Sequence, residues 1–384
     1  MKDFIFLFSI ILLVSCGSPE QQSKLANRNT MSFSMDTVMV SPGQEIVFLN
    51  RGIHQSFLSS DRRYLYNFNP SDNSLEKIDL NELRLEKKIP FEKEGPNGIG
   101  GNVHTIFPLN ADSLYFGSYS GVGGIFTWEG KKVMDLPLNK LGDKTEHLSS
   151  NEQLGGIKSF STGAMVFYGL ISVFDKDETE LATIDVNAQK ISRIPLPLMD
   201  RTRPFRVTFR DGPAKSSISP GSYLVTEGNK VILSTGVSNE MYVLDKGGDS
   251  LQHFSYDSQI MPIEKAGKYH NEVNSEEEMY AIYQTINEEI NYNAPFWDTE
   301  EELFYRFSYI GEYHPNSDKP VFDVIPDRCK VFLTIYDENL ELIGESLVPE
   351  LTKVPGRHFA KNGKIWIFEN MEDEMGFVRL SIDF

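Results

Sequence analysis

NYNAPFWDTEEELFYRFS, residues 291–308, is the stretch that decides the predicted fold. A bend containing Pro295 leads into a short strand around Trp297, an acidic turn follows, and a second strand begins at Leu303. The turn and second strand recur five more times in varied form along the chain. A repeated small unit indicates that neighbouring units pack on one another to bury a continuous core.

Each copy of the unit has an aliphatic residue where its aromatic-rich strand begins. These residues are Leu65, Leu114, Val166, Val231, Leu303 and Ile365. Further strand-like runs follow most copies, which gives about four antiparallel strands per unit. That pattern is typical of β-propeller blades, so we predict an all-β, six-bladed β-propeller. A seventh blade between Met199 and Tyr223 is the alternative, although that stretch lacks a copy of the unit.

The last unit is incomplete. After Ile365 only residues 376–382 remain as a strand before the chain ends. A strand-like run at residues 35–40 stands free before the first unit. We predict that this N-terminal strand completes the last blade, because joining the two ends removes an exposed sheet edge.

One helix is predicted at about residues 275–290, between the fourth and fifth units. Ser275 followed by three glutamates forms a capping box, and acidic residues suit the positive end of a helix. An apolar stripe follows at helical spacing: Met279, Ile282, Tyr283, Ile286 and Ile290. We expect this helix to lie as a cap beside the mouth of the propeller channel. The alternative is packing on the outer rim.

The N-terminus predicts export and lipid attachment. Residues 1–15 have the charge and short apolar run of a signal peptide, and they lead into Leu13-Val14-Ser15-Cys16, which resembles a bacterial lipobox. Cys16 is then the lipidated residue, 16–32 a flexible polar tether and 33–384 the propeller. We expect an outer-membrane lipoprotein that faces the periplasm or the cell surface. The alternative is an ordinary secretory signal that is removed together with Cys16.

Composition narrows the partners further. The 384 residues carry 55 acidic against 37 basic side chains, a net charge of −18. Such a field repels phosphate backbones, so no nucleic-acid partner is expected. With Cys16 lipidated or removed, Cys329 is the only free thiol, which rules out a disulfide framework. No nucleotide-binding loop and no zinc-type His/Cys spacing is present, so we expect no cofactor and no metal, and a monomer.

The run from the predicted helix through residues 293–308 resembles the domain-of-unknown-function 4221 family, as do the lipobox and the blade spacing. Residues 94–98, Glu-Gly-Pro-Asn-Gly, look like a connector that opens a blade in related propellers. The resemblance implies lipoprotein-type chains of Bacteroidota with a TolB-like six-bladed propeller. It implies no activity.

Candidate binding residues come from the positions where the first strand of each blade should begin. Ligands of propellers are usually held at that mouth of the channel, and polar groups that converge there suggest a binding site. The candidates are His54, Gln55, Asn102, His104, Lys158, Ser217, Asn293, Arg357 and His358. Alternatively, these groups bind only backbone atoms and channel water.

This set contains histidines but no acid, which favours binding over catalysis. We therefore expect a non-catalytic recognition module for a small anionic or sugar ligand, or for a partner protein, and we predict no catalytic residue. The alternative is a lactone- or glycan-directed hydrolase or lyase at the same mouth.

Arg306 is a separate candidate. It alternates with apolar residues on an inner strand, so its side chain should be buried between blades. A buried guanidinium needs partners, which predicts a structural clamp, with a ligand contact as the alternative.

Overall fold

The structure, a computed structural model, describes residues 31–119, 121–142, 147–160, 163–173, 178–314 and 322–383. The predicted signal peptide and Cys16 lie outside these residues. In the part that is described, no helix is long and apolar enough to cross a membrane. The predicted all-β class is confirmed, because nearly every described element is a strand.

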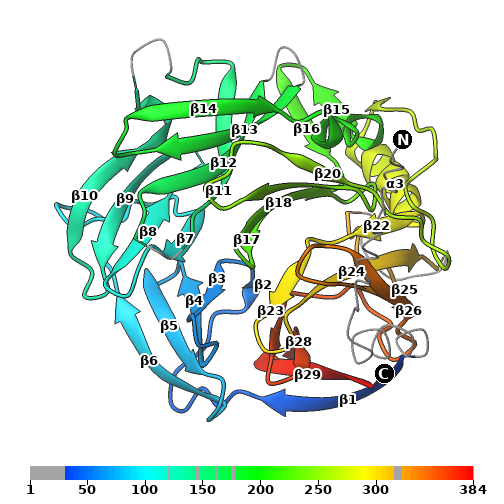
Figure 1. Cartoon of the computed structure of the whole chain (residues 1–384), viewed down its shortest axis with the longest axis horizontal. Helices are drawn as coiled ribbons and strands as arrows, with labels where there is room; N and C mark the ends of the chain where they lie inside the picture. The colour runs from blue at the N-terminus through cyan, green and yellow to red at the C-terminus, as the bar shows by residue number, and fades with distance from the viewer. Residues whose placement is uncertain are drawn as a thin grey trace, which may run out of the picture.

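Most described strands belong to large antiparallel sheets that follow one another around a common centre (Figure 1). The first sheet contains β3 (Ser56–Leu58), β4 (Tyr64–Asn69), β5 (Ser74–Asp79) and β6 (Arg84–Pro90). The second contains β7 (Thr105–Pro108), β8 (Ser113–Gly117), β9 (Val122–Thr127) and β10 (Lys132–Pro137). The third contains β11 (Glu152–Lys158), β12 (Val166–Val173), β13 (Glu178–Asp185) and β14 (Lys190–Pro195).

Three more large sheets continue the series. The fourth contains β17 (Ser222–Glu227), β18 (Lys230–Thr235), β19 (Met241–Asp245) and β20 (Gln252–Phe254). The fifth contains β22 (Ile290–Tyr292), β23 (Phe296–Asp298), β24 (Leu303–Glu312), β25 (Arg328–Tyr336) and β26 (Leu342–Leu347). The sixth contains β27 (His358–Lys361), β28 (Lys364–Met371), β29 (Glu374–Asp383) and β1 (Ser32–Met39). The repeated aliphatic residues lie in β4, β8, β12, β18, β24 and β28, the second strand of each sheet.

The predicted N-terminal closing strand is confirmed. β1 pairs antiparallel with β29 from Ser32 opposite Asp383 to Met39 opposite Gly376. The strand starts three residues before the predicted run and ends one residue short of it. Its pairing covers the edge of β29 with the other end of the chain, which removes one unpaired edge.

Apolar side chains fill the space between every two consecutive large sheets. Each pair shares one cluster of buried residues, and the sixth and first sheets share theirs in the same way, for example through Leu65 and Phe377. The core is therefore divided among the interfaces between sheets. Whether the sheets close into a six-bladed propeller stays a prediction.

Two tight hairpin turns fix where the inner strands β17 and β27 end. Gly228 and Asn229 join β17 to β18, and Asn362 and Gly363 join β27 to β28, all with φ between 52° and 65°. Two-residue turns of this hand need residues that tolerate positive φ, and Asn and Gly do so at low cost. The residues just before these turns, Glu227 and Lys361, are thereby fixed at the ends of inner strands.

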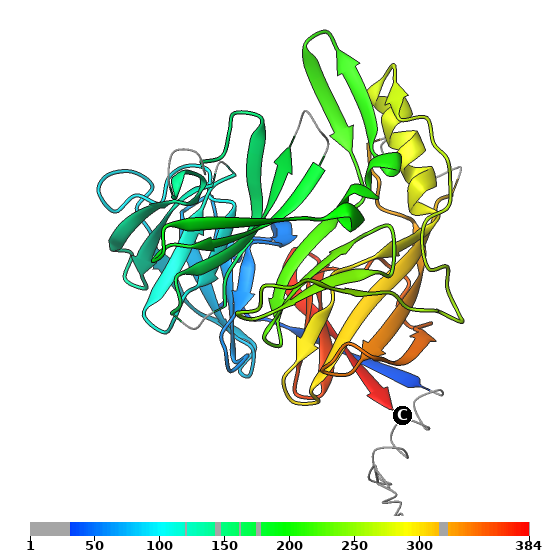
Figure 2. The same ribbon diagram turned by 45° about the horizontal axis from the view of Figure 1, so that its top comes forward.

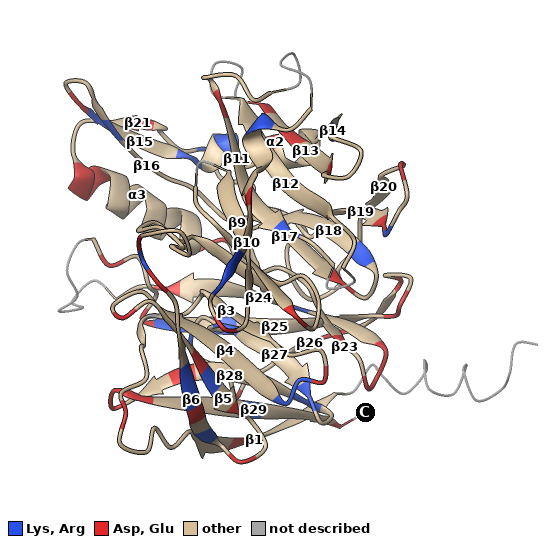
Figure 3. Cartoon of the chain, turned by 90° about the vertical axis from the view of Figure 1, so that its left-hand side faces the viewer, with Lys and Arg blue, Asp and Glu red and all other residues tan. Residues whose placement is uncertain are grey.

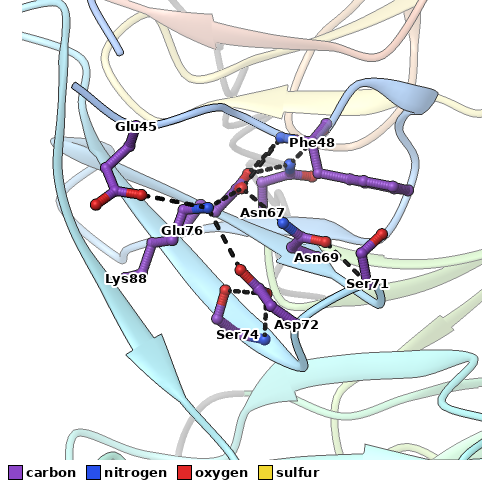
Figure 4. A network of polar contacts seen from close by, with 9 residues as sticks. All are labelled: Glu45, Phe48, Asn67, Asn69, Ser71, Asp72, Ser74, Glu76 and Lys88. Atoms are coloured by element: carbon purple, nitrogen blue, oxygen red, sulfur yellow. Dashed lines mark hydrogen bonds and ion pairs between the residues drawn. The ribbon is translucent and has the colours of Figure 1, made fainter. Parts of the chain in front are cut away.

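A buried polar network attaches the segment before β2 (Asn50–Ile53) to the first sheet (Figure 4). The Glu76 carboxylate is fully buried and accepts hydrogen bonds from the Phe48 amide at 3.0 and 3.1 Å, from Asn67 at 2.8 Å and from Asn69 at 3.2 Å. Its other partner is the Lys88 ammonium at 3.6 Å. Burial raises the pKa of Glu76, and these donors oppose that shift. The network serves the fold, since every contact is made within one sheet and its flanking segment.

The region between β14 and β17 does not form a seventh large sheet. It contains the short helices α2 (Pro197–Asp200) and η2 (Arg203–Phe205) and then the hairpin of β15 (Val207–Asp211) and β16 (Ala214–Ile218). β15 also pairs in parallel with β21 (Glu272–Val273), which gives a small three-stranded sheet. A further short helix, η1 (Leu138–Lys140), follows β10.

The predicted helix is α3 (Glu276–Asn287), shorter than expected at its C-terminal end. Ser275 Oγ accepts the Glu278 amide at 3.1 Å, as the capping box predicts, and Figure 3 shows the acidic first turn. The helix ends because side chains bind its last carbonyls: Lys265 Nζ donates to Ile286 at 2.7 Å and Asn291 Nδ2 to Asn287 at 2.9 Å. Ile290 therefore belongs to β22.

The apolar face of α3 packs on the small sheet. Met279 and Ile286 are buried against Val207 and Val273, and α3 contacts β15, β16 and β21. Figure 1 places the helix at the rim, and Figure 2 shows it rising with the β15–β16 hairpin. The helix therefore does not lie over the centre, and the prediction of a cap at the mouth is wrong. The β15–β16 hairpin, which the sequence pattern did not reveal, supplies apolar side chains against which α3 packs.

Candidate functional site

The first strands of the large sheets meet at the common centre (Figure 1). β3 contacts β7, β7 contacts β11, β11 contacts β17, β17 contacts β23, and β23 contacts β27. Two arginines extend this series from the last sheet to the first. Arg357 Nη2 donates to the Ser56 carbonyl at 3.4 Å, and Arg62 donates to the carbonyls of Ala360 and Trp297, the latter at 2.6 Å.

Four charged side chains, hereafter the central cluster, converge from these inner strands: Arg62, Lys158, Glu227 and Arg357. Arg62 lies in the β3–β4 turn with φ of 52°, Lys158 and Glu227 end β11 and β17, and Arg357 precedes β27. Burial raises the pKa of Glu227, and the charges of Arg62, Arg357 and Lys158 oppose that shift. All three cations therefore lie within electrostatic reach of a single carboxylate.

The surroundings of Lys158 disfavour the charged form of its ammonium. Burial among the inner strands lowers the pKa of its ammonium to about 8, and the charge of Arg357 lowers it further, while Glu227 opposes both. The residue keeps partial exposure to solvent. A cation in this position gains from any additional anion that displaces the solvent.

Two histidines extend the cluster toward the starts of the inner strands. Burial and the charge of Arg357 lower the pKa of His54, and burial and the charge of Lys158 lower that of His104. Both imidazoles therefore favour the neutral form, which can donate one hydrogen bond and accept another. The His104 ring stacks on Tyr119 with 3.5 Å between centroids, and Tyr119 is 59 % exposed.

Two other candidates make contacts within the fold. His358 Nδ1 lies 2.7 Å from the Gly356 carbonyl, and its ring packs edge-on against Phe296 and Phe307. Burial lowers its pKa to about 4, so the ring is neutral at neutral pH. Gln55 Nε2 donates to the Val103 carbonyl at 2.8 Å, which connects β3 to the segment before β7.

The remaining candidates lie apart from the central cluster. Asn102 is exposed in the loop before β7. Asn293 lies in the break between β22 and β23, where its amide donates to the Phe307 carbonyl at 2.9 Å. Ser217 was expected at the first strand of the fourth sheet, but that strand is β17. Ser217 belongs to β16 and its hydroxyl contacts Thr208 at 3.0 Å, because the long connector folds into its own hairpin.

Arg306 is 1 % exposed and joins the fifth sheet to the loop after β18. Its guanidinium donates to four backbone carbonyls: Asn293 and Asn239 at 2.8 Å, Thr235 at 3.1 Å and Ser238 at 3.2 Å. The group also lies 4.7 Å from the centroid of the Tyr292 ring. These contacts are those of a clamp between two sheets.

Sequence reasoning missed Glu227 and Arg62. Arg62 lies in the turn after the first strand of its sheet, and Glu227 is the last residue of such a strand, whereas the predicted candidates were residues that begin one. The signal was present, because Glu227-Gly228-Asn229 and Asp61-Arg62-Arg63 are the turns of two repeat units. Among the residues that the structure describes, no group of three or more His, Cys, Asp or Glu side chains could hold a metal ion.

A family model described as "Domain of unknown function (DUF4221)" matches residues 28–347. The chain belongs to this family. A crystal structure of a DUF4221 member from Bacteroides vulgatus is similar over 93 % of this chain and 99 % of that one, with a TM-score of 0.68 and 14 % identity. This likeness establishes the fold the two chains share. No curated protein sequence matches the chain.

Two further solved structures are more distant. BamB from Moraxella catarrhalis is 11 % identical, with a TM-score of 0.33 over 84 % of this chain and 71 % of that one. A DUF4623 family protein from Bacteroides eggerthii is 12 % identical, with a TM-score of 0.39 over 86 % and 71 %. Scores of this size do not establish a common fold.

Proposed function

We propose that this DUF4221 member is a six-bladed β-propeller that binds a small organic acid at its centre, without catalysis. The central cluster carries the proposal. The charges of three cations act on one carboxylate there, in a chain whose net charge is −18. A carboxylate ligand would supply the missing counter-charge, and arginine presents a planar fork that matches a carboxylate.

The proposal includes the location. Lipid attachment at Cys16 would anchor the chain to the outer membrane, facing the periplasm or the cell surface, with the tether leading into β1. The lipobox-like run 13–16 supports this part. Mass spectrometry of the mature N-terminus tests it: a diacylglycerol-modified Cys16 is expected, and an unmodified terminus would contradict the anchor.

A thermal-shift panel tests the binding site. The full chain, purified in detergent, is melted with acetate, succinate, glucuronate and galacturonate, and with glucose as the uncharged control. A ligand of the native state raises the melting temperature by mass action, so at least one acid should raise it and glucose should not.

Two variants of the central cluster test whether the acid binds there. Lys158→Met and Arg357→Met should each weaken binding of the active acid roughly 10- to 100-fold, because a hydrogen bond to a charged group contributes about 1.5–3 kcal/mol. Lys353→Met removes a lysine whose side chain is 75 % exposed and should leave the affinity unchanged. Equal losses in all three variants, or a panel without any shift, would refute the proposal.

One observation favours the alternative of a lactone- or glycan-directed hydrolase or lyase. Glu227 has a raised pKa and lies within reach of Lys158, whose pKa is about 8, and such opposed shifts are common among catalytic acids and bases. Glu227→Gln separates the two functions. An enzyme would lose turnover of a glycan or lactone substrate, whereas a binding module would bind the acid more tightly once the competing carboxylate is neutral.

A further inference from the structure

A cavity that no residue of the central cluster lines is present between the first and sixth sheets. Its volume is about 490 Å³, within the usual range of small-molecule sites. The β3–β4, β5–β6 and β27–β28 turns surround it, with Trp366 from β28 and Arg379 from β29. We call it the seam cavity, because the sheet completed by β1 meets the first sheet here.

Lys361 is the unusual residue of the seam cavity. Its side chain lines the cavity and the residue is 4 % exposed. Among the described residues its ammonium has no hydrogen bond and no ion pair. Burial lowers the pKa of Lys361. The negative charges of Glu300, Asp61 and Asp79 oppose this shift from beyond ion-pair distance, and the positive charge of Arg62 adds to it. The side chain is enclosed by protein, while its ammonium keeps access to the cavity and has no protein partner among the described residues. An anionic ligand in the cavity would meet this cation.

The neighbouring acids are already occupied. Asp79 is 1 % exposed and accepts Arg63 Nη2 at 2.9 Å together with the amides of Asn81 and Glu82. Glu300 accepts the Asn362 amide at 3.0 Å, and Asp61 accepts the Ser59 hydroxyl at 2.5 Å. Each of these acids is held by at least one hydrogen bond, and none lies within ion-pair distance of Lys361.

The other two cations of the cavity keep unused donors. Arg63 binds Asp79 through Nε and Nη2, which leaves Nη1. Arg379 binds Asp36 through Nε at 2.5 Å, and its guanidinium carbon lies 5.1 Å from the centroid of the Trp366 ring. Side-chain amides of Asn81 and Asn362 add neutral donors to the lining.

We propose that the seam cavity is a second binding site, for the oxyanion group of a small molecule, with Lys361 as its principal counter-charge. A carboxylate and a phosphate share the required chemistry, because each offers several acceptor oxygens and negative charge to one ammonium and two guanidinium edges. The inference does not depend on the proposed function, since no residue of the central cluster lines this cavity.

Calorimetric titration of the full chain with inorganic phosphate and with glucuronate tests this site and distinguishes the two oxyanions. We expect at least one probe to bind the wild type. Lys361→Met keeps the aliphatic stem and should weaken that binding by about tenfold or more. Asn362→Asp, which places a negative charge in the same turn, should weaken it as well. Lys353→Met, which removes a lysine with a 75 % exposed side chain outside both sites, should leave it unchanged.

A melting curve without ligand excludes a merely structural role. Removing a charge that has no protein partner should leave the melting temperature of Lys361→Met equal to or above that of the wild type. The proposal is overturned if the wild type binds neither probe, if Lys361→Met binds as the wild type does, or if Lys361→Met melts at a lower temperature.

Discussion

Lys158 is the residue whose chemistry most directly connects the fold to binding. The inner strands hold its ammonium beside Arg357, and the pKa of about 8 leaves it mostly charged at neutral pH. An anion bound there would interact with the protonated form and would raise that pKa again. The end of β11 thus supplies a cation that loses its charge at mildly alkaline pH.

The affinity of the central site for an acid should therefore depend on pH. Above about pH 8 the free protein loses the Lys158 proton, so the affinity should fall by up to about tenfold per pH unit, because binding must then take up a proton. Calorimetry between pH 7 and 10 measures this fall. Lys158→Arg should remove it within this range, since arginine stays charged. A wild-type affinity that is constant across the range would contradict the role of Lys158.

At the scale of elements, β1 determines how the two ends of the chain are joined. Asp36 on β1 binds Arg379 at 2.5 Å and Lys364 at 2.8 Å on the sixth sheet. The hydrogen bond from Arg379, and then the one from Lys364, lowers the pKa of Asp36 to about 2. The seam cavity shares Arg379 with this ion pair, so β1 also shapes that cavity.

The sign of this shift gives a stability prediction. Asp36 has a lower pKa folded than unfolded, so its contribution is complete above the unfolded value of 3.8 and is lost as the pH falls toward about 2. Asp36→Asn should unfold at lower denaturant concentration than the wild type at about pH 6, and the gap should close near pH 2.

The gap should be below about 1 kcal/mol, since the Asp36 side chain is 43 % exposed and solvent screens the pair. Urea unfolding at both pH values measures it. Asp245→Asn removes an exposed carboxylate from a pair with Lys230 at 3.0 Å and serves as the control for β1. A gap for Asp36→Asn that persists at pH 2 would show that the ion pair does not stabilise β1.

At the scale of the whole molecule, the repeat unit predicted most of the large sheets, because an aromatic-rich strand after a polar turn is a local pattern. The closing strand followed from counting strands in the last unit. The β15–β16 hairpin was not predictable in this way, since its strands are short and their apolar and polar residues alternate weakly. The position of α3 was therefore not predictable either, because the helix packs on this hairpin. Ser217 was misplaced for the same reason.

The candidate site was predicted in part. Arg357, His54 and His104 precede inner strands as predicted, whereas Lys158 ends β11 instead of beginning it. Each of the four lies within electrostatic reach of another. Arg62 and Glu227 join them only because separate turns converge on the centre, which is a tertiary effect. Pattern alone also could not show that Phe296 and Phe307 enclose His358.

A crystal structure of the full chain with the acid that gives the largest thermal shift tests the central claim most directly. We expect six large sheets in a closed ring, with the ligand carboxylate at the centre in contact with Lys158 and Arg357. A ligand that contacts neither residue, or a ring with a seventh four-stranded sheet, would contradict it.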